Sequence, residues 1–199
     1  LEKHYKDMQD IEFTIEEGRL WMLQTRSGKR TGAAAIKIAV DMVEEEMLSK
    51  QDAIIRVTPD QIDELLHPKL HMEDEGAATI LARGLPAGPG GGVGQVVFSA
   101  DDAEKWHKDG KTIILVREET SPEDVHGMHV AEAILTAKGG MTSHAALVAR
   151  GWGKCCIVGC SSINIDFIKK EMMINNQTVK EGDWISMNGL KGTIYPGKI

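Results

Sequence analysis

Residues 133–158, AILTAKGGMTSHAALVARGWGKCCIV, predict how the second half of this chain folds. The first four residues form a short apolar run that is typical of a buried strand, and the pair Gly139-Gly140 follows it. A helical pattern then covers residues 143–150. Residues 155–158 have the pattern of a second buried strand. Strands that alternate with helices in this way predict the α/β class.

The same alternation extends to both sides of this segment. The other expected strands lie at 95–98, 112–116, 184–187 and 192–195. The other expected helices begin after Ser99 and at Ser121-Pro122, where a hydroxyl residue can cap the first turn. Asn188-Gly189 is the strongest two-residue signal for a hairpin turn, so the last two strands should pair there. Residues 77–199 are therefore predicted to form one domain.

The first part of the chain has a different pattern. Within residues 1–27, apolar and polar side chains alternate before a turn at Glu17-Gly18, which predicts a β-hairpin. Apolar residues at three- and four-residue steps predict an amphipathic helix over 31–48. Thr58-Pro59 and Gln61 form the capping box of a second, shorter helix. Residues 28–76 are therefore predicted to be a helical linker.

Charge and hydropathy argue against two classes of partner. The 199 residues include 30 acidic and 23 basic side chains, a formal net charge of −7, whereas proteins that bind nucleic-acid backbones concentrate Lys and Arg. No apolar run approaches the roughly 20 residues of a membrane span. The first residues do not contain a basic region followed by an apolar stretch, so we expect no secretory signal. We therefore expect neither nucleic acid nor a membrane as a partner.

The cysteines predict a reducing environment. Cys155, Cys156 and Cys160 are an odd number of thiols within six residues, unlike the evenly paired cysteines of a secreted disulfide framework. A zinc site would need two spaced pairs or nearby histidines. We expect buried free thiols on a core strand.

The glycine-rich run over 84–94 does not match a nucleotide-binding loop. A dinucleotide fingerprint that uses Gly88 and Gly90 needs a third glycine at position 93, which is Val93. A Walker loop ending at Gly110-Lys111-Thr112 needs glycine at position 105, which is Lys105. We expect a turn-rich entry where the backbone passes close to another element.

His144 is the strongest candidate for chemistry. Thr142 or Ser143 can cap the helix in front of it, and the first N–H groups of a helix attract an anion. A phosphoryl group on the His144 ring would lie among these donors and two hydroxyls, while the small Ala145 and Ala146 would leave room for a reaction partner. Nucleophilic catalysis through a covalent histidine intermediate suits this arrangement. For a lone histidine, a purely structural role at the start of the helix is the alternative.

The octapeptide Gly139-Gly140-Met141-Thr142-Ser143-His144-Ala145-Ala146 resembles the active-site signature of the phosphoenolpyruvate-utilising enzymes. The resemblance is greatest to the pyruvate, phosphate dikinase branch of that family. Residues 84–98 resemble the opening of its swivelling phosphohistidine domain, and residues 180–192 resemble the closing strands. Residues 10–31 resemble the last hairpin of the ATP-grasp domain.

The resemblance implies a swivelling β/β/α phosphohistidine domain and a set of functional residues. His144 would accept a pyrophosphoryl and then a phosphoryl group, supported by Gly140, Thr142 and Ser143. Thr142 matches a threonine that is reversibly phosphorylated in plant relatives. The implied ATP contacts, as remnants of the nucleotide site, are Glu12, Gln24 and Arg26. Glu12 would also contact Mg²⁺ through ATP. A hairpin that simply carries charged side chains on its exposed face would explain these three residues equally well.

The resemblance also implies a larger parent enzyme. Its other partners would be inorganic phosphate and pyruvate or phosphoenolpyruvate, and the domain would swing between two distant sites. The chain alone is expected to turn over nothing. The parent is expected to be a homo-oligomer in the cytoplasm or in an organelle such as a plastid or glycosome. A phosphoenolpyruvate synthase piece, which commonly has Thr-Cys-His here, and a non-catalytic module of the same fold are the alternatives.

Overall fold

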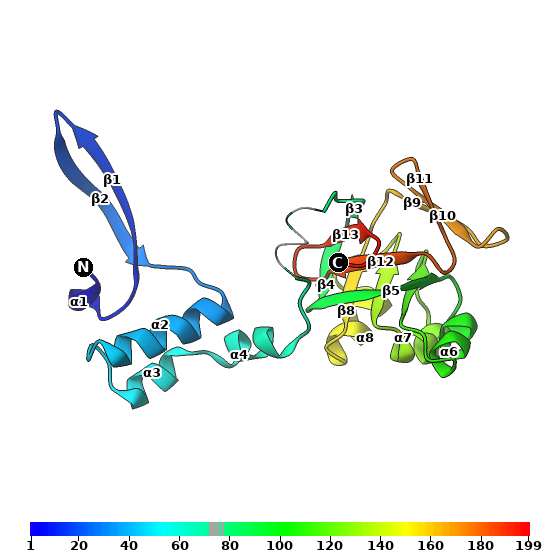
Figure 1. Ribbon diagram of the computed structural model, residues 1–199, viewed down its shortest axis with the longest axis horizontal. Coiled ribbons are helices and arrows are strands. Elements are labelled where there is room, and N and C mark those ends of the chain that lie inside the picture. Colours follow the sequence, from blue (N-terminus) through cyan, green and yellow to red (C-terminus); the bar gives the residue numbers. More distant parts are fainter. Residues whose placement is uncertain (72–75, 77) are drawn as a thin grey trace. The chain divides into compact units, whose positions relative to one another are not determined.

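The computed structural model describes residues 1–71, 76 and 78–199, and these form two compact units (Figure 1). Unit 1 comprises Leu1–Leu66 and unit 2 comprises His67–Ile199. Each unit has its own secondary structure and packing.

Unit 1 begins with a short helix and the predicted β-hairpin. α1 (Glu2–Tyr5) precedes the antiparallel strands β1 (Gln9–Glu16) and β2 (Arg19–Ser27). The turn falls at Glu17 and Gly18, which have φ angles of 49° and 73°. Glycine adopts such a left-handed conformation without a steric cost, which explains why the hairpin reverses there. The predicted hairpin is confirmed.

Three helices complete unit 1. They are α2 (Gly32–Glu44), α3 (Lys50–Arg56) and α4 (Pro59–Leu66). Thr31 caps α2, and Thr58 and Gln61 exchange hydrogen bonds of 3.0 and 3.4 Å as a capping box at the start of α4. Both predicted helices are confirmed. α3 was not predicted, because a seven-residue helix holds too few apolar positions to show a period, although its N-cap Ser49 is a usable signal.

Unit 2 is built on a mixed sheet in which eight strands are seen among the described residues. Its strands, in spatial order, are β3 (Ala82–Arg83), β13 (Thr193–Pro196), β12 (Trp184–Asn188), β5 (Gly91–Val97), β6 (Ile113–Arg117), β7 (Ala133–Thr136), β8 (Cys155–Val158) and β4 (Leu85–Gly88). The four strands from β5 to β8 run parallel to one another. The outer pairings are antiparallel.

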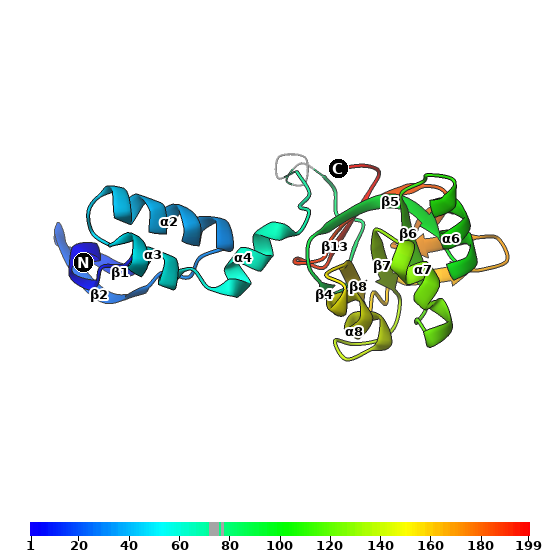
Figure 2. The ribbon, with the colours of Figure 1, turned by 90° about the horizontal axis from the view of Figure 1, so that it is seen from below.

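Helices cover one face of this sheet (Figures 1 and 2). They are α6 (Ala100–Lys108), the 3₁₀ turn η1 (Pro122–Asp124) with α7 (Val125–Val130), and α8 (His144–Gly151). Ala103, Met128 and Ala149 from these helices pack against Leu115 and Ile134 of the central strands in one apolar cluster. Successive strand residues point to opposite faces, so the neighbouring strand positions face away from the helices.

A second, smaller sheet packs on the other face. It contains β9 (Ile163–Asp166), β10 (Glu171–Ile174) and β11 (Gln177–Lys180), all antiparallel. Met172 and Ile174 of this sheet share a buried cluster with Ile114 and Leu135 of the large sheet. The layers are therefore small sheet, large sheet and helices, which confirms the expected β/β/α fold. The small sheet itself was not predicted, because four-residue strands carry only two inward side chains each.

One of two predictions about loops was wrong. The glycine-rich run was expected to be a turn-rich entry, but most of it lies in β4 and β5, and only Pro89-Gly90 separates these strands. The expected close approach of backbone is present: a Cβ added to Gly92 would lie 2.6 Å from the Cβ of Ala133. The predicted hairpin at Asn188-Gly189 is confirmed, because β12 and β13 pair there. Asn188 pairs with Thr193, so the loop has four residues, and the Asn188 side chain accepts from the N–H groups of Leu190 and Lys191.

Candidate functional site

The candidate site lies at the carboxyl edge of the parallel strands. β6 and β7 are adjacent, and Arg117 at the end of one pairs with Thr136 at the end of the other. The chain leaves β6 toward Thr120 and leaves β7 toward His144. Ligand sites of open α/β sheets form at this edge, because the loops after neighbouring strands meet there.

A hydrogen bond joins these two loops. The hydroxyl of Thr120 lies 3.1 Å from Nδ1 of His144. Both residues are only partly exposed, and the other ring nitrogen, Nε2, has no hydrogen-bond partner among the described residues. Thr120 was missed by sequence reasoning; its place three residues beyond a buried parallel strand was the signal that could have found it.

The start of α8 is built as the sequence predicted. Ser143 is the N-cap, its hydroxyl accepts from the N–H of Ala146 at 3.4 Å, and its own N–H donates to the carbonyl of Gly140 at 2.9 Å. Thr142 is exposed. The N–H groups of Thr142, His144 and Ala145 show no hydrogen bond within the part of the chain that the structure describes, so three donors remain for an anion.

Two neighbours of the histidine have a different role from the expected one. Ala145 and Ala146 were expected to leave open space beside the ring, but both are buried, at 2% and 0% exposure. They belong to the cluster between the helices and the large sheet. Their small side chains therefore let α8 approach the sheet closely. The open side of the loop lies instead at Gly140, where an added Cβ would meet no atom within 4 Å.

The three residues expected to contact ATP lie together on the hairpin of unit 1. Glu12 of β1 pairs with Gln24 of β2, and Arg26 lies two residues further along the same strand, so all three share a face. Arg26 forms an ion pair of 2.9 Å with Asp10, its partner across the hairpin. Asp10 adds a second carboxylate to this face, a position that no local sequence pattern marks.

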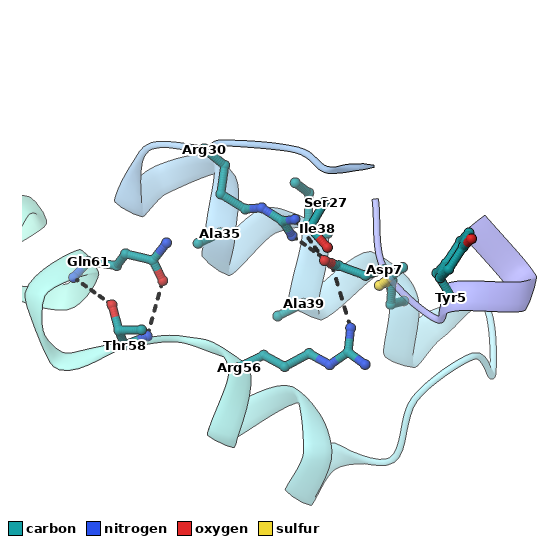
Figure 3. Close-up of a pocket in the computed structure, with 11 residues that line it drawn as sticks. Tyr5, Asp7, Ser27, Arg30, Ala35, Ile38, Ala39, Arg56, Thr58 and Gln61 are labelled. Atoms are coloured by element: carbon teal, nitrogen blue, oxygen red, sulfur yellow. Dashed lines mark hydrogen bonds and ion pairs between the residues drawn. The ribbon is translucent and has the colours of Figure 1, made fainter. Parts of the chain in front are cut away.

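A polar cavity of about 410 Å³ lies at the base of the same hairpin (Figure 3). Asp7 projects between two guanidinium groups: Arg30 binds both carboxylate oxygens, at 2.8 and 3.0 Å, and Arg56 lies 3.6 Å away. The hydrogen bonds from Arg30 lower the pKa of the Asp7 carboxyl, although partial burial acts in the opposite direction. Arg30 follows β2 and Arg56 ends α3, so Asp7 holds the hairpin base against the helices.

The cysteines are buried and free, as predicted. Burial raises the pKa of both Cys155 and Cys156 to about 12, because the thiolate would lose its hydration. Burial also raises the pKa of Cys160, which lies just after β8. Neutral thiols of this kind are poor nucleophiles, so they serve packing.

Within residues 1–71, 76 and 78–199, no three His, Cys, Asp or Glu side chains are grouped closely enough to hold a metal ion. In the same residues, no helix has both the length and the apolar composition needed to cross a membrane.

The comparisons with known proteins agree with the geometry. Residues 109–192, which include Thr120 and the whole octapeptide, match the family model of the PEP-utilising enzyme mobile domain. Residues 1–47 match the pyruvate phosphate dikinase AMP/ATP-binding domain. The two halves of the chain are therefore similar to two domains of PEP-utilising enzymes, the mobile domain and the AMP/ATP-binding domain. The second match extends beyond the predicted boundary at residue 27, into α2.

Individual curated proteins match along the whole chain. It is 62% identical over 198 residues to "Pyruvate, phosphate dikinase 1, chloroplastic" of Arabidopsis thaliana. It is 58% identical to "Pyruvate, phosphate dikinase 2" of Zea mays and 56% identical to the protein of that name from Oryza sativa. These alignments cover 100% of this chain but only 21–22% of the relatives, so the chain corresponds to about a fifth of their length.

Proposed function

We propose that this chain is the central phosphoryl-carrying segment of a pyruvate, phosphate dikinase. The parent reaction converts ATP, pyruvate and inorganic phosphate to AMP, phosphoenolpyruvate and pyrophosphate. One observation carries the proposal. At the start of α8, Nδ1 of His144 is hydrogen-bonded to the Thr120 hydroxyl, while Nε2 has no hydrogen-bond partner among the described residues. The identities of 56–62% to pyruvate, phosphate dikinases support the dikinase over a phosphoenolpyruvate synthase.

The proposed chemistry uses the lone pair on Nε2. Nε2 of His144 attacks the β-phosphorus of ATP, the bond from that phosphorus to the α,β-bridging oxygen breaks, and AMP leaves with the electron pair. The terminal phosphoryl group of the pyrophosphoryl-histidine then passes to inorganic phosphate, which yields pyrophosphate. The remaining phosphoryl group passes to the enolate oxygen of pyruvate after its methyl group has lost a proton. This transfer frees Nε2 again.

Thr120 supports this assignment of the ring nitrogen. A hydroxyl can accept a hydrogen bond from Nδ1–H. That arrangement holds the proton on Nδ1 and leaves the lone pair on Nε2, as the second partner of a catalytic histidine commonly does.

The loop before the histidine would support the transferred group. The N–H groups of Thr142, His144 and Ala145 have no partner among the described residues, so they can donate to phosphate oxygens, and the open space at Gly140 leaves room for these oxygens. Ser143 supports the site indirectly, because its hydroxyl is used as the helix cap. Thr142 is exposed and so is accessible to a modifying kinase, which fits the regulatory phosphorylation that the resemblance implies.

The hairpin residues would belong to the nucleotide site. Arg26 and Gln24 present donors suited to phosphate oxygens, and Glu12 lies directly opposite Gln24. Mg²⁺ in nucleotide sites is usually held by one or two carboxylates together with the phosphates, and Glu12 with Asp10 fits that number. Bound there, Mg²⁺ would supply neutralising charge for the phosphates. These two residues would hold it only together with the nucleotide.

The functional division of the chain follows from these roles. Residues 1–27 would end the ATP-grasp domain, 28–76 would be the linker, and 77–199 would be the swivelling domain. The parent is proposed to be a homo-oligomer. A reducing compartment, either cytoplasm or plastid, suits three free thiols. Because the acceptor site and the rest of the nucleotide site would lie elsewhere in the parent, the 199-residue chain alone would turn over nothing.

The test is labelling of the parent enzyme with ATP that carries ³²P in the β-phosphoryl group. We expect acid-labile label that maps to His144, and complete loss of label in His144→Asn, because asparagine offers no nucleophilic nitrogen. His107→Asn is the matched control, since His107 is an exposed histidine on α6 of the same unit. Label that persists in His144→Asn would contradict the proposal and favour the non-catalytic module.

A further inference from the structure

Arg150 contacts the loop in front of His144, although it lies near the other end of α8. Its Nε donates to the carbonyl of Ala146 at 3.1 Å, and one terminal nitrogen donates to the carbonyl of Met141. The side chain therefore runs back along the helix toward its N-terminus, the direction that helical side chains favour. One guanidinium thus joins the body of α8 to the middle of the Gly140–Ser143 turn.

Holding the Met141 carbonyl has a geometric consequence. The peptide between Met141 and Thr142 is planar and trans, so its N–H points opposite to its carbonyl. By fixing the direction of the carbonyl, Arg150 also fixes the direction of the Thr142 N–H. That N–H is one of the three donors at the start of α8 without a partner among the described residues.

The rest of the loop does not fix this peptide. Gly139 has a φ of 95°, and Gly140 has no atom within 4 Å of its Cβ position, so both allow the backbone to rotate. The Ser143 N–H to Gly140 carbonyl bond closes the turn but does not engage the central peptide. Within the described residues, the contact from Arg150 is the one hydrogen bond made to that peptide.

We propose that Arg150 is a positioning residue for the phosphoryl transfer: it holds the Met141–Thr142 peptide so that the Thr142 N–H is preorganised for the phosphoryl group on His144. The inference rests on the proposed function of His144. An arginine suits the task because its fork reaches two carbonyls at once, whereas a lysine has a single nitrogen.

The kinetic test uses the parent enzyme with Arg150→Met and Arg150→Lys. We measure the rate of His144 labelling against ATP concentration. A donor displaced by about 1 Å costs up to 100-fold in rate, so we expect Arg150→Met to lower the maximal labelling rate about 10- to 100-fold. The ATP concentration at half-maximal rate should stay unchanged, because the hairpin residues, not this loop, bind the nucleotide. Arg150→Lys should recover only part of the rate.

Arg83→Met is the matched control. It removes the same charge from an exposed position on β3 of unit 2, and no side-chain hydrogen bond or ion pair of Arg83 is seen among the described residues. It should label at the parental rate. Equal slowing by Arg83→Met would show a general charge effect and would overturn the proposal, as would parental rates in both Arg150 variants. Should Arg150→Met fail to fold, the rate of Arg150→Lys decides between the same two outcomes.

A second readout does not depend on catalysis. In amide NMR spectra of the 199-residue chain, Arg150→Met should shift the Thr142 signal and speed its hydrogen exchange, while signals from the sheet stay in place. If the parent enzyme shows no label on His144 at all, the proposed function fails, and this spectrum still reports whether Arg150 holds the loop. An unchanged Thr142 signal would overturn the positioning role whatever the labelling result.

Discussion

The ring of His144 is held by a residue 24 positions earlier in the sequence. Thr120 reaches its ring nitrogen because β6 and β7 are parallel neighbours, so that the loops after them lie side by side. The helix start contributes donors, while Thr120 contributes the orientation of the ring. The candidate site therefore combines a local motif with one long-range contact.

Replacing Thr120 tests that contact. In Thr120→Val, the hydroxyl is lost and the side-chain volume is kept, so the hydrogen bond that orients the imidazole is removed. Misplacing a reacting group by about 1 Å can cost about 10²-fold in rate, so we expect labelling of His144 to slow about 10- to 100-fold. The measurement is the rate of ³²P transfer from ATP to His144 in the parent enzyme.

Thr120→Ser is the matched variant, because it keeps the hydroxyl and removes only a methyl group. It should label at close to the parental rate. A slow Thr120→Ser variant, or a fast Thr120→Val variant, would show that the 3.1 Å contact is not what orients the ring.

The residues of the site differ in how far the sequence could predict them. The cap at Ser143 and the position of His144 follow from local patterns, since capping involves residues within one turn. Thr120 and Asp10 could not be assigned, because their partners are set by strand pairing. Ala145 and Ala146 were assigned the wrong role, because a local pattern does not say which side of a helix faces the core.

Among the elements, β5 shows most clearly how residue size determines packing. Gly92 faces Ala133 of β7, and an added Cβ would lie 2.6 Å from the alanine Cβ. A Cβ on Gly94 would lie 2.8 Å from the backbone of Ile113 in β6. The glycines therefore fill places in a sheet where no side chain fits.

Gly92→Ala should destabilise unit 2. Overpacking of a well-packed interior typically costs about 1–3 kcal/mol, and here the contact is with a central strand. Gly151→Ala is the control, since Gly151 ends α8 and has nothing within 4 Å of its Cβ position. It should be neutral or slightly stabilising, by up to about 1 kcal/mol. Urea unfolding of the 199-residue chain measures both, and equal stability of the two variants would contradict this account.

The elements that were predicted differ from those that were missed in one physical respect. The strands 112–116, 133–136 and 155–158 are buried on both faces and were recognised as apolar runs, now seen as β6, β7 and β8. The small sheet has only one buried face and very short strands, so its pattern is hard to separate from a loop. The glycines of β4 and β5 conceal strands, because sequence patterns associate glycine with turns.

At the scale of the whole molecule, the two units depend on different acidic side chains. In unit 1, Asp7 is clamped by Arg30 and Arg56. In unit 2, Asp102 bonds to Lys170, and this bond is the main cause of its lowered pKa. A carboxyl whose pKa is lower in the folded state stabilises the fold at pH values above its unfolded pKa.

Asp7→Asn should therefore destabilise unit 1 at neutral pH. Loss of hydrogen bonds to a charged group costs about 1.5–3 kcal/mol. The loss in unfolding free energy relative to the parent chain should be fully present above about pH 4. It should disappear as the pH falls through the lowered pKa of Asp7, because the parent carboxyl is then also neutral. Hydrogen exchange of residues 1–66, measured between pH 7 and pH 3 and corrected for the intrinsic rates, reports this stability.

Asp102→Asn is the control for this experiment, because its ion pair lies wholly in unit 2. It should leave the exchange of residues 1–66 unchanged. Two results would show that the ion pairs of Asp7 do not stabilise unit 1. One is that Asp102→Asn lowers the exchange protection of unit 1 as much as Asp7→Asn does. The other is that the effect of Asp7→Asn is the same at every pH.

The burial of the three thiols makes this chain convenient for spectroscopic labelling. Cys155, Cys156 and Cys160 are buried and are the only cysteines in the sequence. A maleimide probe reacts with accessible thiolates, so a cysteine introduced on an exposed strand or helix would be modified in preference to all three. Pairs of spin labels or fluorophores attached in this way, one in each unit, would record the distance between the units in solution without first removing a native cysteine.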